Sequence, residues 1–345
     1  MDVVTGIPTK SAIYPPPVPA GQDGSHRRVG LEFEFAALRP RDAAELVRDR
    51  FGGEIRQNNP HRYTIEDGDP SPFRVELDAQ YVHPNDRLRE IDETRPWLTD
   101  LVTWIKELDA ETSRILGDLA GDLIPCEIVA PPIEWPRLME METLYRDLGH
   151  AGAAGTDEGL LYAFGLHLNI EVTGETVDDI LPTLQAYLLL SPWLRSDIRV
   201  DGMRRAFPYI DPFPASYLRH ICRPGYAPDI DGMIADYLSF NDTRNRELDM
   251  LPLFAHLRAD LVRAAVDDPR VKPRPAFHWR LPNTLFSERH AGPAAEWRRW
   301  LAVERLARDR EALAEACREL QTLSTFPLSG DLQRLSDRLG AEYRI

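Results

Sequence analysis

Residues 29–35 alternate apolar and acidic side chains at a period of two. In this run, VGLEFEF, the odd positions are all apolar and the acids are Glu32 and Glu34. Successive side chains of a β-strand point to opposite faces, so the run predicts a strand with two carboxylates on one face, roughly 7 Å apart. Carboxylates this close suit a divalent cation, although a water-exposed strand face is the commoner reason for such a pattern.

The same alternation recurs along the chain, and its polar positions again hold residues that bind metals or phosphates. These are Glu76 and Asp78 in residues 74–81, Glu127 in 126–130, His167, Asn169 and Glu171 in 165–172, and His278 and Arg280 in 277–281. Acids, imidazole, carboxamide and guanidinium side chains are suited to holding metals and phosphates. If these strands share one sheet with a common polar side, that side is a groove lined with ligands.

Composition limits the partners. A chain of 345 residues with 43% hydrophobic residues is long enough for one large or two average domains. A net charge of −15 disfavours nucleic acids and anionic membranes as partners and suits a protein that holds divalent cations. The three cysteines, Cys126, Cys222 and Cys317, are far apart in sequence and fit neither a disulfide framework nor a zinc spacing. We therefore expect a reducing, cytoplasmic location.

The amino-terminal stretch is rich in proline and lacks the plan of a secretory signal, and no apolar run approaches the roughly 20 residues needed to cross a bilayer. We expect residues 1–26 to form a disordered or extended lead-in, 27–285 a catalytic domain, and 286–345 terminal helices packed on it. Small residues at 151–155 predict a mobile loop. Irregular structure is expected at 195–228.

Local patterns predict helices at 42–51, 96–119, 136–148, 177–190, 233–238, 247–266, 294–320 and 332–340. Short strands are expected at 54–57 and 62–66, in a meander with the strand that contains Glu76. Strands and helices interleave irregularly, which favours one α+β domain with an antiparallel sheet.

Five motifs occur in an order and spacing that resemble the amidoligase family, a branch of the carboxylate–amine ligases with a glutamine synthetase-like fold. They are GLEFEF (30–35), EIVAPP (127–132), GLHLN (165–169), NDTRNR (241–246) followed by LPL (251–253), and RPAFHWRLPN (274–283). The resemblance covers residues 29–285. Related members carry a second histidine in the third motif, where this chain has Asn169, a weaker metal ligand.

The resemblance implies a curved antiparallel sheet whose concave face holds ATP and Mg²⁺, with helices on the convex face. It also implies a reaction in which a carboxylate is activated as an acyl phosphate and then captured by an amine, giving an amide or isopeptide bond. Polar strand faces fit this chemistry, because phosphoryl transfer needs cations on the phosphate oxygens and donors that hold the phosphate chain.

With the resemblance included, Glu32, Glu34, Glu76 and Glu127 are the predicted metal ligands, the alternative being a wet or salt-bridged strand face. Asp78 is a further candidate ligand. His167 is expected to contact metal or phosphate, and otherwise to be a hydrogen-bonded structural histidine.

Arg280 is the predicted stabiliser of the transferring phosphoryl group, and with His167 and Glu76 it completes the catalytic set. Arg244 and Arg246, at the start of a predicted helix, are expected to bind phosphate or the substrate carboxylate, and otherwise to be ordinary surface charges. Asn169 and Asn283 complete the predicted cofactor-binding set. Cys126 has no evident base nearby and is expected to be a packing residue.

The leading expectation is therefore an ATP- and Mg²⁺-dependent ligase for a small-molecule carboxylate and an amine. Arginines within 195–228 (Arg199, Arg204, Arg205 and Arg219) favour an acidic carboxylate such as a glutamyl or aspartyl compound. Oligomers are compatible with the resemblance. One alternative is a metal-dependent amide or phosphate-ester hydrolase, which the scarcity of imidazoles disfavours. Another is a non-catalytic relative that binds a nucleotide or an acidic metabolite.

Overall fold

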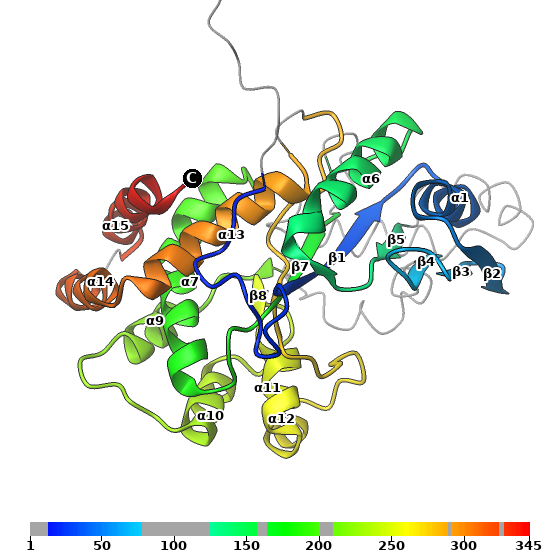
Figure 1. Ribbon diagram of the computed structural model, residues 1–345. Helices are drawn as coiled ribbons and strands as arrows, with labels where there is room; N and C mark the ends of the chain where they lie inside the picture. Colours follow the sequence, from blue (N-terminus) through cyan, green and yellow to red (C-terminus); the bar gives the residue numbers. More distant parts are fainter. Residues whose placement is uncertain (1–12, 78–124, 157–163, 201–209, 289–290, 324–327) are drawn as a thin grey trace, which may run out of the picture.

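A nine-stranded sheet forms the centre of the molecule (Figure 1). The computed structural model describes residues 13–77, 125–156, 164–200, 210–288, 291–323 and 328–345. The strands lie in the order β2-β3-β4-β5-β1-β7-β9-β8, and β6 pairs with β1. All pairings between these strands are antiparallel. The predicted α+β class with an antiparallel sheet is confirmed, while curvature and likeness to glutamine synthetase stay predictions.

The nine strands are β1 (Arg28–Phe35), β2 (Glu54–Asn59), β3 (Arg62–Glu66), β4 (Phe73–Leu77), β5 (Cys126–Val129), β6 (Ile133–Glu134), β7 (Leu166–Glu171), β8 (Leu248–Asp249) and β9 (Ala276–Trp279). All except the two-residue strands β6 and β8 lie at runs that the sequence predicted to be strands. In β1 the apolar residues are fully buried, whereas Glu32 and Glu34 lie on the opposite, partly open face. Period-two alternation thus predicted the two faces correctly.

Aromatic side chains join the apolar face of the sheet to three helices, α1 (Pro40–Phe51), α6 (Leu138–His150) and α13 (Pro293–Arg308). Phe51 of α1 stacks on Phe73 of β4 with ring centroids 4.9 Å apart. The ring centroids of Trp300 in α13 and Trp279 in β9 lie 5.7 Å apart. These contacts bury large apolar surfaces and leave the polar face of the strands free to form a site.

The other helices are η1 (Trp135–Arg137), α7 (Val177–Asp197), α9 (Ala215–Ile221), α10 (Ile230–Phe240), α11 (Leu251–Leu257), α12 (Ala259–Ala265), α14 (Arg310–Thr322) and α15 (Leu328–Tyr343). Helices α14 and α15 lie at the end of the molecule opposite α1 and β2 (Figure 1). Among the described residues, every helix is too short or too polar to cross a membrane. The helix predicted at 96–119 lies outside the described residues, as does Asp78.

Two predicted helices are interrupted. The helix expected at 247–266 is wrong at its start, because Leu248 and Asp249 pair with β9 as β8, and α11 begins only at Leu251. The helix expected at 294–320 breaks at Asp309, whose carboxylate accepts a hydrogen bond from the backbone N–H of Ala312 (3.1 Å) and so begins α14.

Residues 151–155 do not form the mobile loop expected from their small side chains. Ala153 and Ala154 are buried. Ala154 exchanges two backbone hydrogen bonds with Ala36 at the end of β1 (2.9 and 3.0 Å). The segment is therefore anchored to the sheet.

The described part of the proline-rich lead-in, from residue 13, packs on α13, and its residues 20–26 form a turn closed by a bridge between Ala20 and His26. The indole N–H of Trp297 donates to the carbonyl oxygen of Tyr14 (2.9 Å). Arg27, which is 1% exposed, donates to the carbonyl oxygen of Val18 (3.1 Å) and forms a buried ion pair with Glu304 (2.5 Å). The domain boundaries at 26/27 and 285/286 stay predictions.

Candidate functional site

The polar face of the sheet lines a groove of about 500 Å³. Strand register orders its side chains into rows across the sheet. One row runs from Arg62 through Glu76 and Glu127 to Glu34, on β3, β4, β5 and β1. The next contains Glu32 opposite His167, and a third contains Asn169 opposite His278. The volume lies in the range of small-molecule sites.

The first row brings together three of the four predicted metal ligands. Glu76, Glu127 and Glu34 face one another on adjacent strands, and like charges placed directly opposite destabilise a sheet. At one end Arg62 Nε lies 3.2 Å from Glu76 Oε2. At the other, the backbone N–H of Gly165 donates to Glu34 Oε2 (2.8 Å). A divalent cation on this row would relieve the remaining repulsion.

The fourth predicted ligand, Glu32, belongs to a tighter cluster with two imidazoles. Ligand atoms of Glu32, His167 and His278 all lie within 4.8 Å of one another. Glu32 Oε2 is 3.2 Å from His167 Nδ1 and 3.9 Å from His278 Nε2. The geometry of this cluster, termed here the imidazole triad, could hold one metal ion.

Hydrogen bonds fix the carboxylate of Glu32 from its other side. Asn169 Nδ2 donates to Glu32 Oε1 (2.8 Å), and Arg274 Nε donates to Asn169 Oδ1 (2.8 Å), which orients the carboxamide. Gly30 leaves room for this arrangement, because a Cβ there would approach Asn169 Cβ at 3.3 Å. Burial raises the pKa of Glu32, but the hydrogen bond with His167 and nearby positive charge hold it well below its usual range.

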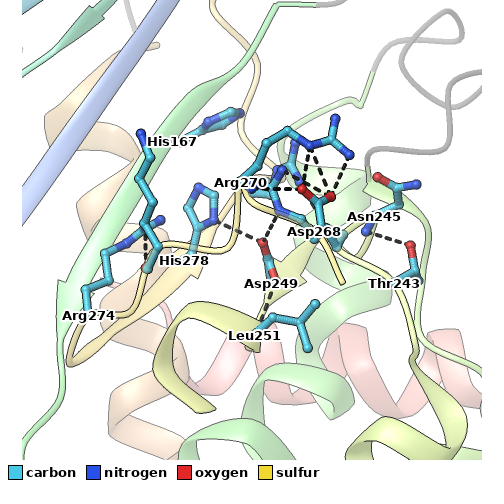
Figure 2. Close-up of polar contacts among 12 residues, drawn as sticks. His167, Thr243, Asn245, Asp249, Leu251, Asp268, Arg270, Arg274 and His278 are labelled. Atoms are coloured by element: carbon cyan, nitrogen blue, oxygen red, sulfur yellow. Dashed lines mark hydrogen bonds and ion pairs between the residues drawn. The ribbon is translucent and has the colours of Figure 1, made fainter. Parts of the chain in front are cut away.

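His278 is buried and neutral at neutral pH. Burial, together with the positive charge of Arg274, lowers its pKa to about 3 although Asp249 and Glu32 oppose the change. His278 Nδ1 faces Asp249 Oδ2 at 3.4 Å (Figure 2). Asp249 is fully buried on β8, and its other oxygen accepts the backbone N–H of Leu251 (3.1 Å).

Six cationic side chains line the same groove as the acids. They are Arg74, Arg244, Arg270, Lys272, Arg274 and Arg280. Three of them alternate along residues 270–274, a stretch that leads into β9 and lies near His278 (Figure 2). Arg280 donates through Nη1 to the carbonyl oxygen of Arg244 (2.9 Å), and both residues line the groove. A groove with this charge pattern can bind an anion together with a cation.

Some predicted site residues lie elsewhere. Arg246 donates to the carbonyl oxygen of Pro212 (2.7 Å), and Asn283 is buried with its amide near the carbonyl oxygens of 198 and 199 (3.4 and 3.3 Å). Neither residue is among those lining the groove. Arg244 does line it, but the prediction that it lies at the start of a helix is wrong, because Leu248 and Asp249 form β8 and α11 begins only at Leu251.

Sequence reasoning missed three polar residues of this region. Arg274 was seen only within a motif, and Asp249 was placed inside a helix. His278 was recognised on a polar strand face but was not included among the metal ligands. His278 could have been added to the predicted ligands if its strand had been paired with the strand of Asn169, which lies opposite it in the β7–β9 register. No local signal marks Asp249, because a two-residue strand is too short for periodicity.

The fold and site together define an α+β protein with a groove that combines acids, imidazoles and cations. A model of the family described as putative amidoligase enzymes matches residues 25–302, most of the chain, and the chain therefore belongs to this family. Membership indicates a ligase-type role in general and small-molecule substrates. Searches of curated proteins and of solved structures found no match.

Proposed function

We propose that this amidoligase is an ATP- and Mg²⁺-dependent carboxylate–amine ligase that forms an amide or isopeptide bond through an acyl phosphate. The observation that supports this best is the charge pattern of the groove, which four carboxylates and six cationic side chains line together. Acids suit the cation that accompanies ATP, and guanidinium groups suit phosphate oxygens and carboxylates.

The reaction has two stages. A carboxylate oxygen of the first substrate attacks the γ-phosphorus of ATP, the bond to the β-phosphate oxygen breaks, and ADP leaves. The amine then attacks the acyl carbon, the carbon–oxygen bond to phosphate breaks, and the amine nitrogen loses a proton. The groove must keep water away from the mixed anhydride between the stages.

The acidic residues fit Mg²⁺, which takes oxygen ligands. Glu34, Glu76 and Glu127 would hold it from adjacent strands, with Glu32 beside them. Mg²⁺ supplies charge neutralisation on the phosphate oxygens. The like-charged row supports this assignment, because three carboxylates that face one another on adjacent strands repel unless a cation lies among them.

Arg280 is proposed to stabilise the charge that builds on the transferring phosphoryl group, and Arg244 to bind a phosphate or the substrate carboxylate. His167 contacts Glu32 and lies 3.8 Å from Glu34, so it would position both carboxylates. The cationic residues 270, 272 and 274 favour an acidic substrate. Arg219 does not contribute to this preference, because it donates to the carbonyl oxygens of 320 and 323 (3.1 and 2.9 Å).

A second candidate function is metal-dependent hydrolysis. In the sequence analysis the small number of histidines on the polar strand faces disfavoured a hydrolase. In the structure, however, the two histidines His167 and His278 lie close to Glu32. Two histidines and one carboxylate form a common ligand set of catalytic zinc sites. This function would need neither ATP nor an amine.

One assay separates the candidates. The purified protein is incubated with ATP, Mg²⁺ and a panel of acidic amino acids and amines while ADP is followed. A ligase forms ADP only when both cosubstrates are present, and a hydrolase cleaves amides or phosphate esters without ATP. A protein that only binds these compounds gives neither product, and that result would refute the proposal.

A further inference from the structure

Asp249 and His278 form a buried pair outside the predicted ligand set. They lie opposite each other in the β8–β9 register, 0% and 4% exposed, with Oδ2 and Nδ1 3.4 Å apart (Figure 2). An ionised carboxylate can only accept a hydrogen bond. An imidazole with one ring proton is therefore favoured to carry it on Nδ1, beside the carboxylate, which leaves the lone pair on Nε2.

That lone pair points into the groove toward another acceptor. Neither ring nitrogen of His278 makes a full hydrogen bond among the described residues: Nδ1 lies 3.4 Å from Asp249 Oδ2, and Nε2 lies 3.9 Å from Glu32 Oε2. A nitrogen lone pair and a carboxylate oxygen repel each other at this distance unless a cation lies between them. His167, whose ring centroid is 5.5 Å from that of His278, completes the arrangement.

We propose that Asp249 positions His278 as a nitrogen ligand, and that the imidazole triad binds a divalent transition-metal ion in preference to Mg²⁺. Imidazole suits transition metals such as Co²⁺ and Zn²⁺, whereas Mg²⁺ prefers oxygen ligands and retains its waters. Carboxylate–histidine–metal arrangements commonly use a second carboxylate in the role of Asp249. The inference concerns the same groove as the proposed function but does not require ligase activity.

The distances between the ligand atoms of the imidazole triad suit a transition-metal ion after small side-chain movements. Ligand bonds of about 2.1 Å in a tetrahedral site place the ligand atoms roughly 3.4 Å apart. Glu32 Oε2 is at 3.2 Å from one imidazole nitrogen and 3.9 Å from the other. Three protein ligands leave one position open for water or substrate.

The test is direct metal binding by the full chain without ATP. Co²⁺ is titrated into the apoprotein, and its visible absorption intensifies when the ion leaves water for a four- or five-coordinate protein site. We expect one absorbing site, displaced by Zn²⁺ but not by a hundredfold excess of Mg²⁺. His278→Gln should lose the absorption.

Asp249→Asn tests the positioning role. Its carbonyl oxygen can still accept from Leu251, but its NH₂ group then faces His278 Nδ1 and favours the proton on Nε2. The Kd for Co²⁺ should rise by about 10- to 100-fold. Asp236→Asn is the matched control, because Asp236 pairs with His220 (2.8 Å) away from the groove. It should bind Co²⁺ like the wild type.

Equal Co²⁺ affinity in Asp249→Asn and wild type would overturn the positioning role, and displacement of Co²⁺ by equimolar Mg²⁺ would overturn the metal preference. If Asp249→Asn does not fold, ¹⁵N-histidine NMR of the wild type, assigned with His278→Gln, decides the first point. A proton on Nε2 of His278 would refute it. Co²⁺ binding in a protein that forms no ADP would refute only the proposed function.

Discussion

At the scale of single residues, Glu32 and Glu34 differ in their partners although they share one strand. Glu32 is held by His167 and Asn169, whereas Glu34 accepts a backbone N–H and faces Glu127. Glu32→Gln and Glu34→Gln should both fold normally but lose Mg²⁺-dependent ATP turnover, because the amide keeps the shape and removes the charge that holds the cation.

Calorimetry with Mg-ATP checks this prediction. Glu66→Gln is the control, a carboxylate on β3 that pairs with Arg56 outside the groove. Unchanged Mg-ATP affinity in both groove variants would remove Glu32 and Glu34 from the metal site.

Arg280→Lys keeps a positive charge but loses the planar guanidinium. If Arg280 stabilises the transferring phosphoryl group, kcat should fall by about two to three orders of magnitude. The KM for ATP should change much less, because the interaction strengthens in the transition state. Steady-state kinetics separate the two parameters, and weaker ATP binding at full kcat would make Arg280 a ground-state ligand.

The residues of the groove differ in how well the sequence predicted them. Glu32, Glu34, Glu76 and Glu127 could be found because each follows the period of its own strand. Asp249 could not, because its role depends on a neighbour 29 positions later in the chain that only the β8–β9 pairing brings close.

At the scale of elements, a buried ion pair joins helix α7 to the segment before β8. Arg195 Nη1 lies 2.7 Å from Glu247 Oε2, and Glu247 is fully buried and also bonded by Ser191. The backbone of Glu247 accepts the N–H of Arg280 (2.9 Å). The pair therefore supports the strand end that presents Arg280.

Arg195→Met should lower the free energy of unfolding by about 3–5 kcal/mol, because it leaves the carboxylate of Glu247 buried without its cation. Urea denaturation measures the change. The double variant Arg195→Met, Glu247→Gln should recover part of the loss. If Arg195→Met is as stable as the wild type, the ion pair makes no net contribution to stability.

The destabilisation of Arg195→Met should depend on pH. Burial raises the pKa of Glu247 while Arg195 opposes the rise, so removing Arg195 raises it further. The native state then binds a proton at a pH where the unfolded chain does not, and stability increases as pH falls through the native pKa of Glu247 toward its unfolded value. Unfolding curves at pH 8 and pH 5 should show a smaller gap between variant and wild type at pH 5. A constant gap would contradict this explanation.

Element boundaries were predictable where a local rule sets them. Helix α1 ends at Phe51, where the helix predicted at 42–51 also ends, and the longer strands follow their alternation. The start of β8 was not predictable, because pairing with β9 outweighs the helical pattern of 247–266. In α7, Pro182 and Pro192 did not end the helix, which is buried over most of its length and therefore stabilised by packing.

At the scale of the whole molecule, the proposed chemistry fixes the path of one oxygen atom. If a carboxylate is activated by ATP, ¹⁸O from the labelled carboxylate should appear in the released phosphate. Mass spectrometry of the phosphate measures the transfer. Hydrolysis of ATP by water would leave the label in the carboxylate, and unlabelled phosphate in a reaction that does make amide would exclude the acyl phosphate.

The contacts of residues 13–19 matter for the choice of where to truncate this chain. The family match begins at residue 25, but the carbonyl groups of Tyr14 and Val18 lie before it. A fragment cut at the family boundary would leave the buried donors of Trp297 and Arg27 without these acceptors. Each buried donor left unpaired costs about 1–3 kcal/mol. Poor yield of such a fragment would then reflect where it was cut, and not an unstable fold.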